Sequence, residues 1–208
     1  KTPSREAIRK PVTIESKYKK QSGGHGQYGH VKIEFEPYDG DELMFCEKVF
    51  GGAVPKNFFP AVEKGLQEAA EHGSIGGFPV VRLKATLIDG SYHPVDSSEM
   101  AFKTAASMAF KDCMKEAQPY LLEPVDSLKI LLPDDKQGDV MSVLSKRRGS
   151  VLGMNSVGGG MTELLAEAPE AELGDFALTL RQITQGLGEF TSEFARYDML
   201  PPGTEIKS

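Results

Sequence analysis

Tryptophan is absent from this 208-residue sequence, and cysteine occurs only twice. Cys46 and Cys113 form no CxxC or comparable ligand spacing, which excludes a disulfide framework and a cysteine-based metal site. We therefore expect two buried free thiols and a reducing, cytoplasmic compartment. No stretch approaches the roughly 20 apolar residues that span a bilayer. The first twenty residues are rich in lysine and arginine and contain no apolar run, so we expect neither a membrane segment nor a signal peptide.

The sequence also has no excess of basic over acidic residues. The chain has 24 lysines and arginines against 30 acidic residues, a net charge of −6. Residues 1–122 contain 16 basic and 16 acidic side chains, whereas residues 123–208 contain 8 and 14. This balance excludes a protein that coats nucleic acid with a uniformly basic surface, but it leaves room for local basic patches. With 39% hydrophobic and 26% charged residues, the composition is that of a globular protein of one or two domains.

The hydrophobic pattern of the first half predicts a sheet with two helices. Val31, Ile33 and Phe35 alternate with charged or polar residues, which is typical of a half-buried strand. Asp96 and Glu99 have the spacing of a capping box at a helix start, with Asp96 as the cap. The expected elements are strands within 11–50, a helix over 55–72, a strand over 78–88 and a helix from 96 to about 117.

The second half predicts a separate domain. Pro119 and Pro124 bracket a segment that we interpret as an interdomain linker. Beyond it the pattern restarts with a strand over 128–132, a helix over 139–146, strands over 151–157 and 164–168, a helix over 173–183 and a strand over 190–197. This βαββαβ order is the signature of a ferredoxin-like fold. The predicted fold class is therefore α+β, in two domains.

A GxGxxG pattern, Gly24-His25-Gly26-Gln27-Tyr28-Gly29, stands out in the first half. A dinucleotide site requires a helix after this motif, and a protein kinase requires VAIK, HRD and DFG motifs that the sequence lacks. No GxxxxGK[ST] segment occurs either, so we expect no nucleotide site in this chain. Two alternatives are left open: a mobile, solvated hairpin connection, and a loop whose backbone approaches a crowded partner.

Basic and aromatic residues surround this glycine cluster. Residues 17–33 contain no acidic side chain, and Tyr18 and Tyr28 are interleaved with lysines and with His25 and His30. Lysines neutralise phosphate and aromatic rings stack on bases, so the composition fits an RNA-binding surface as well as a solvated hairpin. The lysines concerned are Lys17, Lys19, Lys20 and Lys32.

His93 lies in a loop between a predicted strand and a predicted helix. It has no neighbouring cysteine or histidine that would complete a metal site, and no GxSxG or other nucleophile–base set accompanies it. We therefore predict no catalytic residue and no metal site. Lys146, Arg147 and Arg148 end a predicted helix before Gly149, where basic residues complement the helix dipole. A phosphate clamp is the alternative interpretation of these three residues.

Five separated segments, in the same order, resemble elongation factor G, the translational GTPase that drives ribosomal translocation. They are QSGGHGQYGHV at 21–31, GGAVPKNFFPAVEKG at 51–65, GSYHPVDSSEMAFK at 90–103, GDVMSVLSKRRG at 138–149 and LRQITQG at 180–186. The resemblance covers nearly the whole chain and implies a C-terminal fragment of such a factor. Its implied parts are a linker at 1–9, a domain IV-like tip domain at 10–121, a ferredoxin-like domain V at 122–201 and a tail at 202–208.

The resemblance implies a role for specific residues. Domain IV of the family is elongated, is related to a small-subunit ribosomal-protein fold, and enters the decoding centre, where it promotes tRNA–mRNA translocation. His93 is expected to donate a hydrogen bond to RNA, with Lys17, Lys19, Lys20 and Lys32 in support, and Lys146, Arg147 and Arg148 are expected to contact the large subunit. The residues implied for the ribosome-binding tip are Ser22, Gly23, Gly24, His25, Gly26, Gln27, Tyr28, Gly29, Ser91, Tyr92, His93 and Pro94.

Partners and cofactors follow from the same resemblance. We expect a monomer that contacts rRNA of both subunits and the tRNA–mRNA complex. GTP and magnesium would be bound by upstream domains of a ribosome-dependent GTPase, so no cofactor is expected in this chain. Leu187 after Gly186 and the segment AELGD at 171–175 depart from the family pattern. A specialised paralogue that acts in ribosome recycling is therefore one alternative, and a stand-alone protein-interaction module is another.

Overall fold

The computed structural model describes residues 2–204, apart from the side chain of Ser22. Residue contacts divide it into two compact units, one of residues 5–121 and one that begins at Leu122 and includes the residues before Arg5. The expected linker at 1–9 contains a strand, β1 (Arg5–Ile8), that belongs to the first unit. Of the expected linker and tail, Lys1 and residues 205–208 lie outside the described part of the chain.

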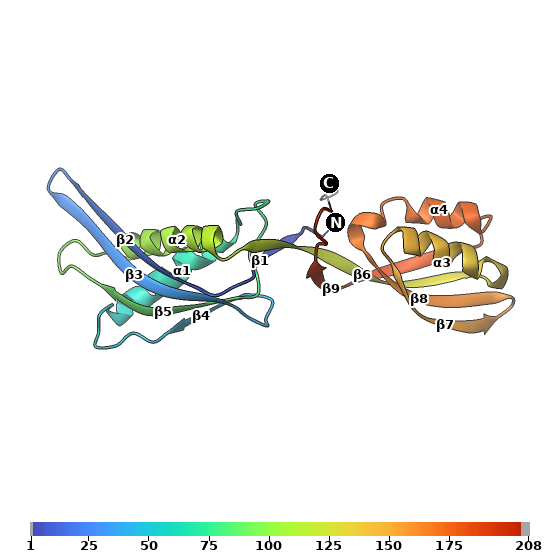
Figure 1. Cartoon of the computed structure of the whole chain (residues 1–208), viewed down its shortest axis with the longest axis horizontal. Coiled ribbons are helices and arrows are strands. Elements are labelled where there is room, and N and C mark those ends of the chain that lie inside the picture. The colour runs from blue at the N-terminus through green and yellow to red at the C-terminus, as the bar shows by residue number, and fades with distance from the viewer. Residues whose placement is uncertain (1, 205–208) are drawn as a thin grey trace. The chain divides into compact units, whose positions relative to one another are not determined.

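The first unit is a four-stranded sheet with two helices on one face (Figure 1). The strand order is β2-β3-β5-β4; β4 and β5 run parallel and the other neighbours run antiparallel. The α+β class predicted from the sequence is confirmed. The elements are β2 (Val12–Ser22), β3 (His25–Pro37), β4 (Leu43–Glu47), the 3-10 helix η1 (Lys56–Phe58), α1 (Phe59–Ala70), β5 (Leu83–Ser91) and α2 (Glu99–Glu116).

The core of the first unit lies between this sheet and its helices. Val31, Ile33 and Phe35 of β3 are fully buried, as their period-two pattern predicted. The two helices lie close together because Gly65 of α1 has no side chain. A Cβ there would overlap the carbonyl oxygen of Lys103 on α2. Small residues at the contact thus allow both helices to pack on one sheet face.

Both cysteines are free thiols, as their number and spacing predicted. Burial of Cys113 on α2 raises the pKa of its thiol to about 12, so it stays protonated at neutral pH. A reactive cysteine requires a low pKa and an exposed sulfur, and Cys113 has neither. Cys46 on β4 is only partly buried, which corrects the expectation that both side chains lie in the core.

The glycine cluster forms a two-residue hairpin turn. Pairing of β2 with β3 continues to Ser22 and His25, so only Gly23 and Gly24 lie between the strands. Their φ angles are 58° and 89°, and a two-residue turn that matches the twist of a hairpin requires positive φ at both positions. The segment 22–29 is therefore mainly paired strand around a two-residue turn, which agrees with the hairpin alternative and not with a longer loop.

The second unit has the ferredoxin-like topology that the sequence predicted. Its strands are ordered β9-β6-β8-β7 with antiparallel neighbours, and helices α3 and α4 lie on one face (Figure 1). Buried side chains of β6 and β8 pack against Phe176 and Leu180 of α4. The elements are β6 (Pro119–Pro133), η2 (Asp134–Lys136), α3 (Gln137–Lys146), β7 (Ser150–Gly158), β8 (Met161–Pro169), η3 (Glu170–Glu172), α4 (Phe176–Ile183) and β9 (Glu189–Met199). Within residues 2–204, we find no helix with the length and apolar character needed to cross a membrane.

The segment between Pro119 and Pro124 is a strand, not a linker. Strand β6 runs without interruption through both prolines. Pro119 is its first residue, where proline is tolerated, and Pro124 precedes Val125, at which pairing with β8 begins. The division between the two units, after Leu121, does fall between the two prolines, whereas the expectation of an irregular linker there is corrected to a continuous strand.

Asp126 on β6 is a buried carboxylate, with 7% of the residue exposed. Burial raises its pKa, and the nearby carboxylate of Glu170 raises it further. A folded-state pKa above the unfolded value means that folding disfavours the ionised form. Its contribution to stability is therefore unfavourable at neutral pH and disappears as the pH falls through the raised pKa.

Replacing Asp126 by asparagine removes this charge while keeping the size of the side chain. We expect D126N to raise the midpoint of thermal unfolding at pH 7 by a few degrees and to give no gain at acidic pH. The matched control is E193Q on β9, which removes an exposed carboxylate. A midpoint for D126N at or below that of E193Q at pH 7 would contradict this assignment.

Candidate nucleic-acid interface

Two segments that are far apart in the sequence meet at Tyr28. The Tyr28 amide donates to the carbonyl oxygen of Asp96 at 3.0 Å, and the Ser97 hydroxyl donates to the carbonyl oxygen of Tyr28 at 2.8 Å. The hydroxyls of Tyr28 and Ser91 lie 2.6 Å apart. These bonds join the β2–β3 hairpin to the loop between β5 and α2. We call residues 22–29 and 91–97 together the tip, and Figure 1 shows both segments at one end of the first unit.

The His93 loop is folded around the histidine ring. Nδ1 of His93 accepts hydrogen bonds from the amides of Val95 at 3.2 Å and Asp96 at 3.0 Å, and the His93 amide donates to the Ser97 hydroxyl at 2.9 Å. An accepting Nδ1 carries no hydrogen, so the neutral ring has its N–H at Nε2. The side chain is 50% exposed. His93 can therefore donate a hydrogen bond through Nε2 without first being protonated.

Ser98, not Asp96, caps α2. The Ser98 hydroxyl accepts from the amide of Ala101 at 3.1 Å, and the helix starts at Glu99. The predicted capping box is therefore wrong by two positions. The Asp96 side chain instead lies against the hairpin, where a Cβ on Gly26 would overlap its carboxylate. Asp96 thus contacts the hairpin through both its backbone and its side chain.

Gly29 allows the start of α2 to lie directly against β3. A Cβ at this position would overlap the carbonyl oxygen of Ala101 and come within 2.9 Å of the Phe102 amide nitrogen. Both atoms belong to backbone, which cannot move out of the way without moving the helix. The last glycine of the GxGxxG pattern is thus required for close packing, and the pattern leads into a strand and not into the helix that a dinucleotide site requires.

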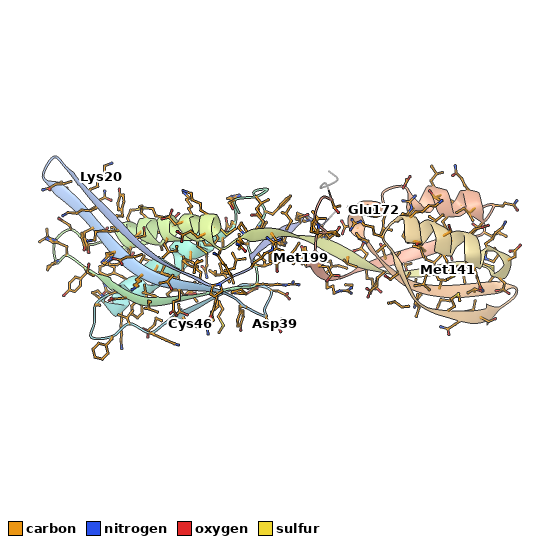
Figure 2. The ribbon with its side chains drawn as sticks, in the orientation of Figure 1. Lys20, Asp39, Cys46, Met141, Glu172 and Met199 are labelled. Carbon is orange, nitrogen blue, oxygen red and sulfur yellow. The ribbon has the colours of Figure 1, made fainter. Side chains whose placement is uncertain are left out.

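The predicted supporting lysines lie on two different faces. Register pairs Glu15 with Lys32, Lys17 with His30 and Lys19 with Tyr28, so Lys17, Lys19 and Lys32 share the sheet face opposite the helices. The Lys17 ammonium is 5.8 Å from the centroid of the Tyr28 ring. Lys20 is one residue further and points to the other face, near the end of the hairpin (Figure 2). Three of the four lysines therefore form one basic strip beside Tyr28.

The sequence analysis named His30 only as part of the basic composition and did not predict its contacts on this face. His30 contacts Glu15 through Nε2 at 2.8 Å and the Ser91 hydroxyl through Nδ1 at 2.7 Å. The pairing of Glu15 with Lys32 and of His30 with Ser91 depends on the register of three strands, which no sequence motif marks. Val95, next to His93, is also 83% exposed and adds an apolar side chain to the tip.

Lys146, Arg147 and Arg148 close α3 in the second unit. The Gly149 amide donates to the carbonyl of Leu144 at 2.7 Å and the Arg148 amide donates to that of Ser145 at 3.3 Å, which together make a Schellman motif. Arg148, with φ of 55°, occupies the left-handed position of this motif, where glycine is the usual residue. Gly149 is needed instead for space, since a Cβ there would lie 2.8 Å from the Leu144 oxygen.

Both arginines are held by acidic groups of their own unit. Arg147 contacts Asp175 and the carbonyl of Glu172, each at 2.6 Å. Arg148 makes two bonds to Glu123, at 2.7 and 2.9 Å, and the hydrogen bond to Glu123 raises its pKa. Both arginines therefore already have acidic partners within the fold, and their contact with the large subunit stays a prediction. For Lys146, a large-subunit contact stays a prediction.

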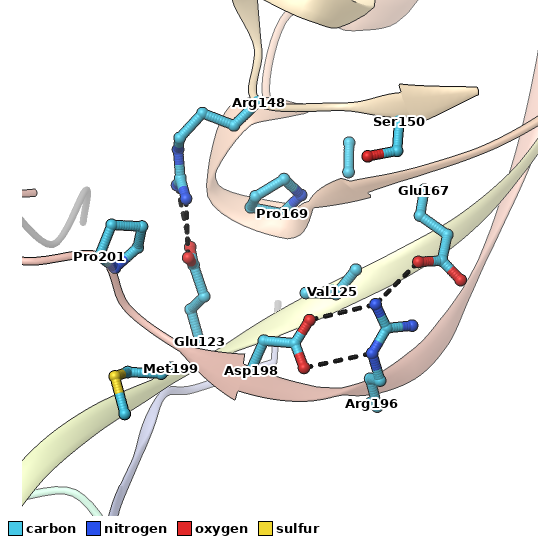
Figure 3. A pocket seen from close by; sticks show the side chains of 11 residues that line it. Glu123, Val125, Arg148, Ser150, Glu167, Pro169, Arg196, Asp198, Met199 and Pro201 are labelled. Atoms are coloured by element: carbon cyan, nitrogen blue, oxygen red, sulfur yellow. Dashed lines mark hydrogen bonds and ion pairs between the residues drawn. The ribbon is translucent and has the colours of Figure 1, made fainter. Parts of the chain in front are cut away.

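The Arg148–Glu123 pair lines a pocket of about 260 Å³ in the second unit (Figure 3). On its other side, Arg196 contacts Glu167 at 2.8 Å and Asp198 at 3.1 Å. The hydrogen bond from Arg196 lowers the pKa of Glu167. Because both arginines of the pocket already pair with its carboxylates, we assign it no ligand. Among the described residues, no group of three or more His, Cys, Asp or Glu side chains is placed to hold a metal ion.

Comparison with known proteins relates both units to one family. The family model for elongation factor G, domain IV, matches residues 1–118, and that for the elongation factor G C-terminus matches residues 120–205. An elongation factor G-like protein of Thermotoga maritima is 47% identical over 204 residues, which are 98% of this chain. A crystal structure from Thermus thermophilus superposes with a TM-score of 0.90 at 46% identity and covers 97% of this chain. The chain spans 30% of the length of each of these two relatives.

The different neighbours of Gly26 and Gly29 generate a test of the tip geometry. We expect G29A to destabilise the first unit by about 1–3 kcal/mol, because the new methyl group meets backbone of α2. G26A is expected to cost less, since the Asp96 side chain can rotate away. The measurement is denaturant unfolding, with G153A, where the added Cβ meets nothing within 4 Å, as control. Equal stabilities of G29A and G153A would show that α2 does not need this close approach.

Proposed function

Because this chain belongs to the elongation factor G family, we propose that it is the C-terminal part of a ribosomal translocase whose tip enters the small-subunit decoding centre. In this proposal the tip promotes movement of tRNA and mRNA, and GTP hydrolysis takes place in domains outside the chain. GTP and magnesium would be bound there, since this chain has no phosphate-binding loop. The partners are then rRNA of both subunits and the tRNA–mRNA complex.

The observation that carries the proposal is the joined tip beside a basic strip. Two segments held together at Tyr28 present the exposed His93 ring, and Lys17, Lys19 and Lys32 lie on the adjacent sheet face. Lysines neutralise phosphate, and hydrogen-bond donors and aromatic rings recognise 2′-hydroxyls and bases. This combination of charge, ring and donor is suited to structured RNA rather than to a small molecule.

The mechanism we propose is mechanical and includes no covalent step. The tip is supported by an eleven-residue pairing of β2 with β3 and by the start of α2, so force applied to the unit would be transmitted to the tip. Nε2–H of His93 would donate to a phosphate or a 2′-hydroxyl, and the glycine turn would let backbone lie close to RNA. Such contacts would hold the advanced tRNA–mRNA complex and oppose its return.

A second candidate, ribosome recycling by a specialised paralogue, is favoured by one observation. Leu187, which stands where the family usually has arginine, is 65% exposed on the second unit. An exposed leucine in place of a cation would change the contact of this unit with RNA. A toeprint of mRNA position distinguishes the two functions, because a translocase advances the mRNA by one codon and a recycling factor does not.

The role of His93 is tested in the full-length protein with GTP. We expect H93A to slow the one-codon advance by roughly fivefold or more, because a hydrogen bond to RNA is lost, while ribosome-stimulated GTP hydrolysis stays near the unsubstituted rate. The control is H72A, which removes an exposed histidine just after α1. Equal rates of mRNA movement for H93A and H72A would count against the proposed role.

The placement of the lysines on two faces gives a further test. If the strip meets RNA phosphates, K19Q should weaken ribosome binding and reduce the slope of log K against log salt by about 0.7. K20Q removes the same charge one residue away on the opposite face, and we expect a smaller change. Slopes that fall equally for both variants would show that RNA contacts do not follow the strand alternation.

A further inference from the structure

Four polar side chains on the open face of the first unit form a continuous chain of hydrogen bonds that ends at the tip. Glu15 contacts His30 Nε2 at 2.8 Å, His30 Nδ1 contacts Ser91 Oγ at 2.7 Å, and Ser91 Oγ contacts Tyr28 Oη at 2.6 Å. They come from β2, β3 and β5. The His30 side chain is 15% exposed, whereas that of Glu15 is 59% exposed. The hydrogen-bond chain therefore runs from an exposed carboxylate through a mostly buried histidine to Tyr28, the residue that joins the two tip segments.

Chemistry sets the direction of every hydrogen bond in this chain. An ionised Glu15 carboxylate only accepts, so Nε2 of His30 must carry a hydrogen. In a neutral ring Nδ1 is then the acceptor, and the Ser91 hydroxyl donates to it. Ser91 Oγ in turn accepts from Tyr28 Oη. With His30 neutral, the Tyr28 hydroxyl hydrogen is thus used inside the protein.

Protonation of His30 reverses this direction. Nδ1 then donates to Ser91 Oγ, and the Ser91 hydrogen is released toward Tyr28 Oη, its other partner at 2.6 Å. The Tyr28 hydroxyl becomes an acceptor within the chain, and its own hydrogen turns outward. The proton comes from solvent, and no covalent bond between heavy atoms changes. The result is a new donor and an added positive charge beside Lys17 on the face that carries the basic strip.

We propose that Glu15, His30 and Ser91 are positioning residues that set the direction of the Tyr28 hydroxyl, so that protonated His30 turns Tyr28 into a hydrogen-bond donor to RNA phosphate. This inference deepens the proposed function and rests on it for the identity of the ligand. RNA phosphate favours both the outward donor and the added charge, so binding takes up a proton at His30. The protonated form of His30 thus gives the tip a higher affinity for RNA than the neutral form.

The surroundings of His30 contain charges of both signs. Glu15 and Lys17 face it from β2, Lys32 lies beside it on β3, and Asp89 lies on β5 opposite Lys32. Across Tyr28, whose ring centroid is 6.4 Å from that of His93, the second loop also brings Asp96. The tip contains two other histidines, His25 and His93. The test must therefore isolate His30 by substitution and not rely on the pH dependence of the whole protein.

The first experiment needs no RNA. In the 208-residue chain with 15N-labelled histidine and tyrosine 13C-labelled at Cζ, NMR reports which His30 nitrogen carries the hydrogen and whether Tyr28 senses its titration. We expect hydrogen on Nε2 in the neutral ring and a Tyr28 Cζ shift that follows the His30 titration. In S91A the His30 titration should persist and the Tyr28 response should be lost. Hydrogen on Nδ1, or a Tyr28 response that survives in S91A, would overturn the relay.

The second experiment measures binding of the full-length protein to small ribosomal subunits at pH 6 and pH 8. For each protein, the quantity compared is the ratio of the affinity at pH 6 to the affinity at pH 8. We expect this ratio to be roughly three- to tenfold larger for the unsubstituted protein than for H30Q, which is the size of effect expected of one charge-assisted hydrogen bond. H72Q, which removes an exposed histidine just after α1, should keep the unsubstituted ratio. Equal ratios for H30Q and H72Q would overturn the role of His30 in RNA binding.

The two experiments separate this inference from the function on which it rests. Binding at both pH values with equal ratios for H30Q and H72Q would leave the proposed function intact and reject the role of His30. If the full-length protein binds small ribosomal subunits at neither pH, the proposed function is rejected. The NMR result tests the hydrogen-bond relay from His30 to Tyr28 independently of RNA binding. A structural defect in H30Q is detected by its unfolding midpoint, and S91A, which keeps His30, then provides the independent test.

Discussion

The first unit depends on one close contact, the packing of the α2 start against β3 at Gly29. No side chain fits between the two backbones there. Once α2 starts at this point, the loop that precedes it must pass over Tyr28, and Asp96 and Ser97 are brought within hydrogen-bonding distance of the hairpin. The distance between strand and helix thus sets the position of the His93 loop. A tip assembled in this way is supported by backbone rather than by long flexible side chains.

The two units use basic residues in different ways. In the second unit, Arg147, Arg148 and Arg196 each face carboxylates, so their charge is neutralised within the fold. In the first unit, Lys17, Lys19 and Lys32 share the sheet face opposite the helices, and among the described residues no ion pair within 4 Å is found for these three lysines, whereas His30 and Lys84 on the same face do pair with carboxylates. The net charges of residues 1–122 and of residues 123–208 do not reveal this difference between the two units. Availability to a polyanion is decided by which charges are already paired.

Pattern and propensity predicted the elements well where periodicity is strong. The alternation around Ile33 and the helical spacing around Leu180 produced elements of the right type, and the order of the last six predicted the ferredoxin-like topology. Local signals failed where tertiary packing competes with them. Asp96 has the capping-box spacing, yet its contacts with the hairpin leave Ser98 as the cap. Pro119 and Pro124 are typical of a linker, yet a neighbouring ladder includes them in a strand.

The sequence by itself determined the fold class and the absence of a nucleotide motif, because these depend on hydrophobic periodicity and on short motifs that can be read directly. Only the tertiary structure decided which residues of the tip act together. The hydrogen-bond chain from Glu15 to Tyr28 joins three strands. Ser91 lies 61 residues from His30 and 63 residues from Tyr28 in the sequence. The strand register and the close approach of α2 bring these residues together. Both result from packing of the whole unit, which no local sequence pattern predicts.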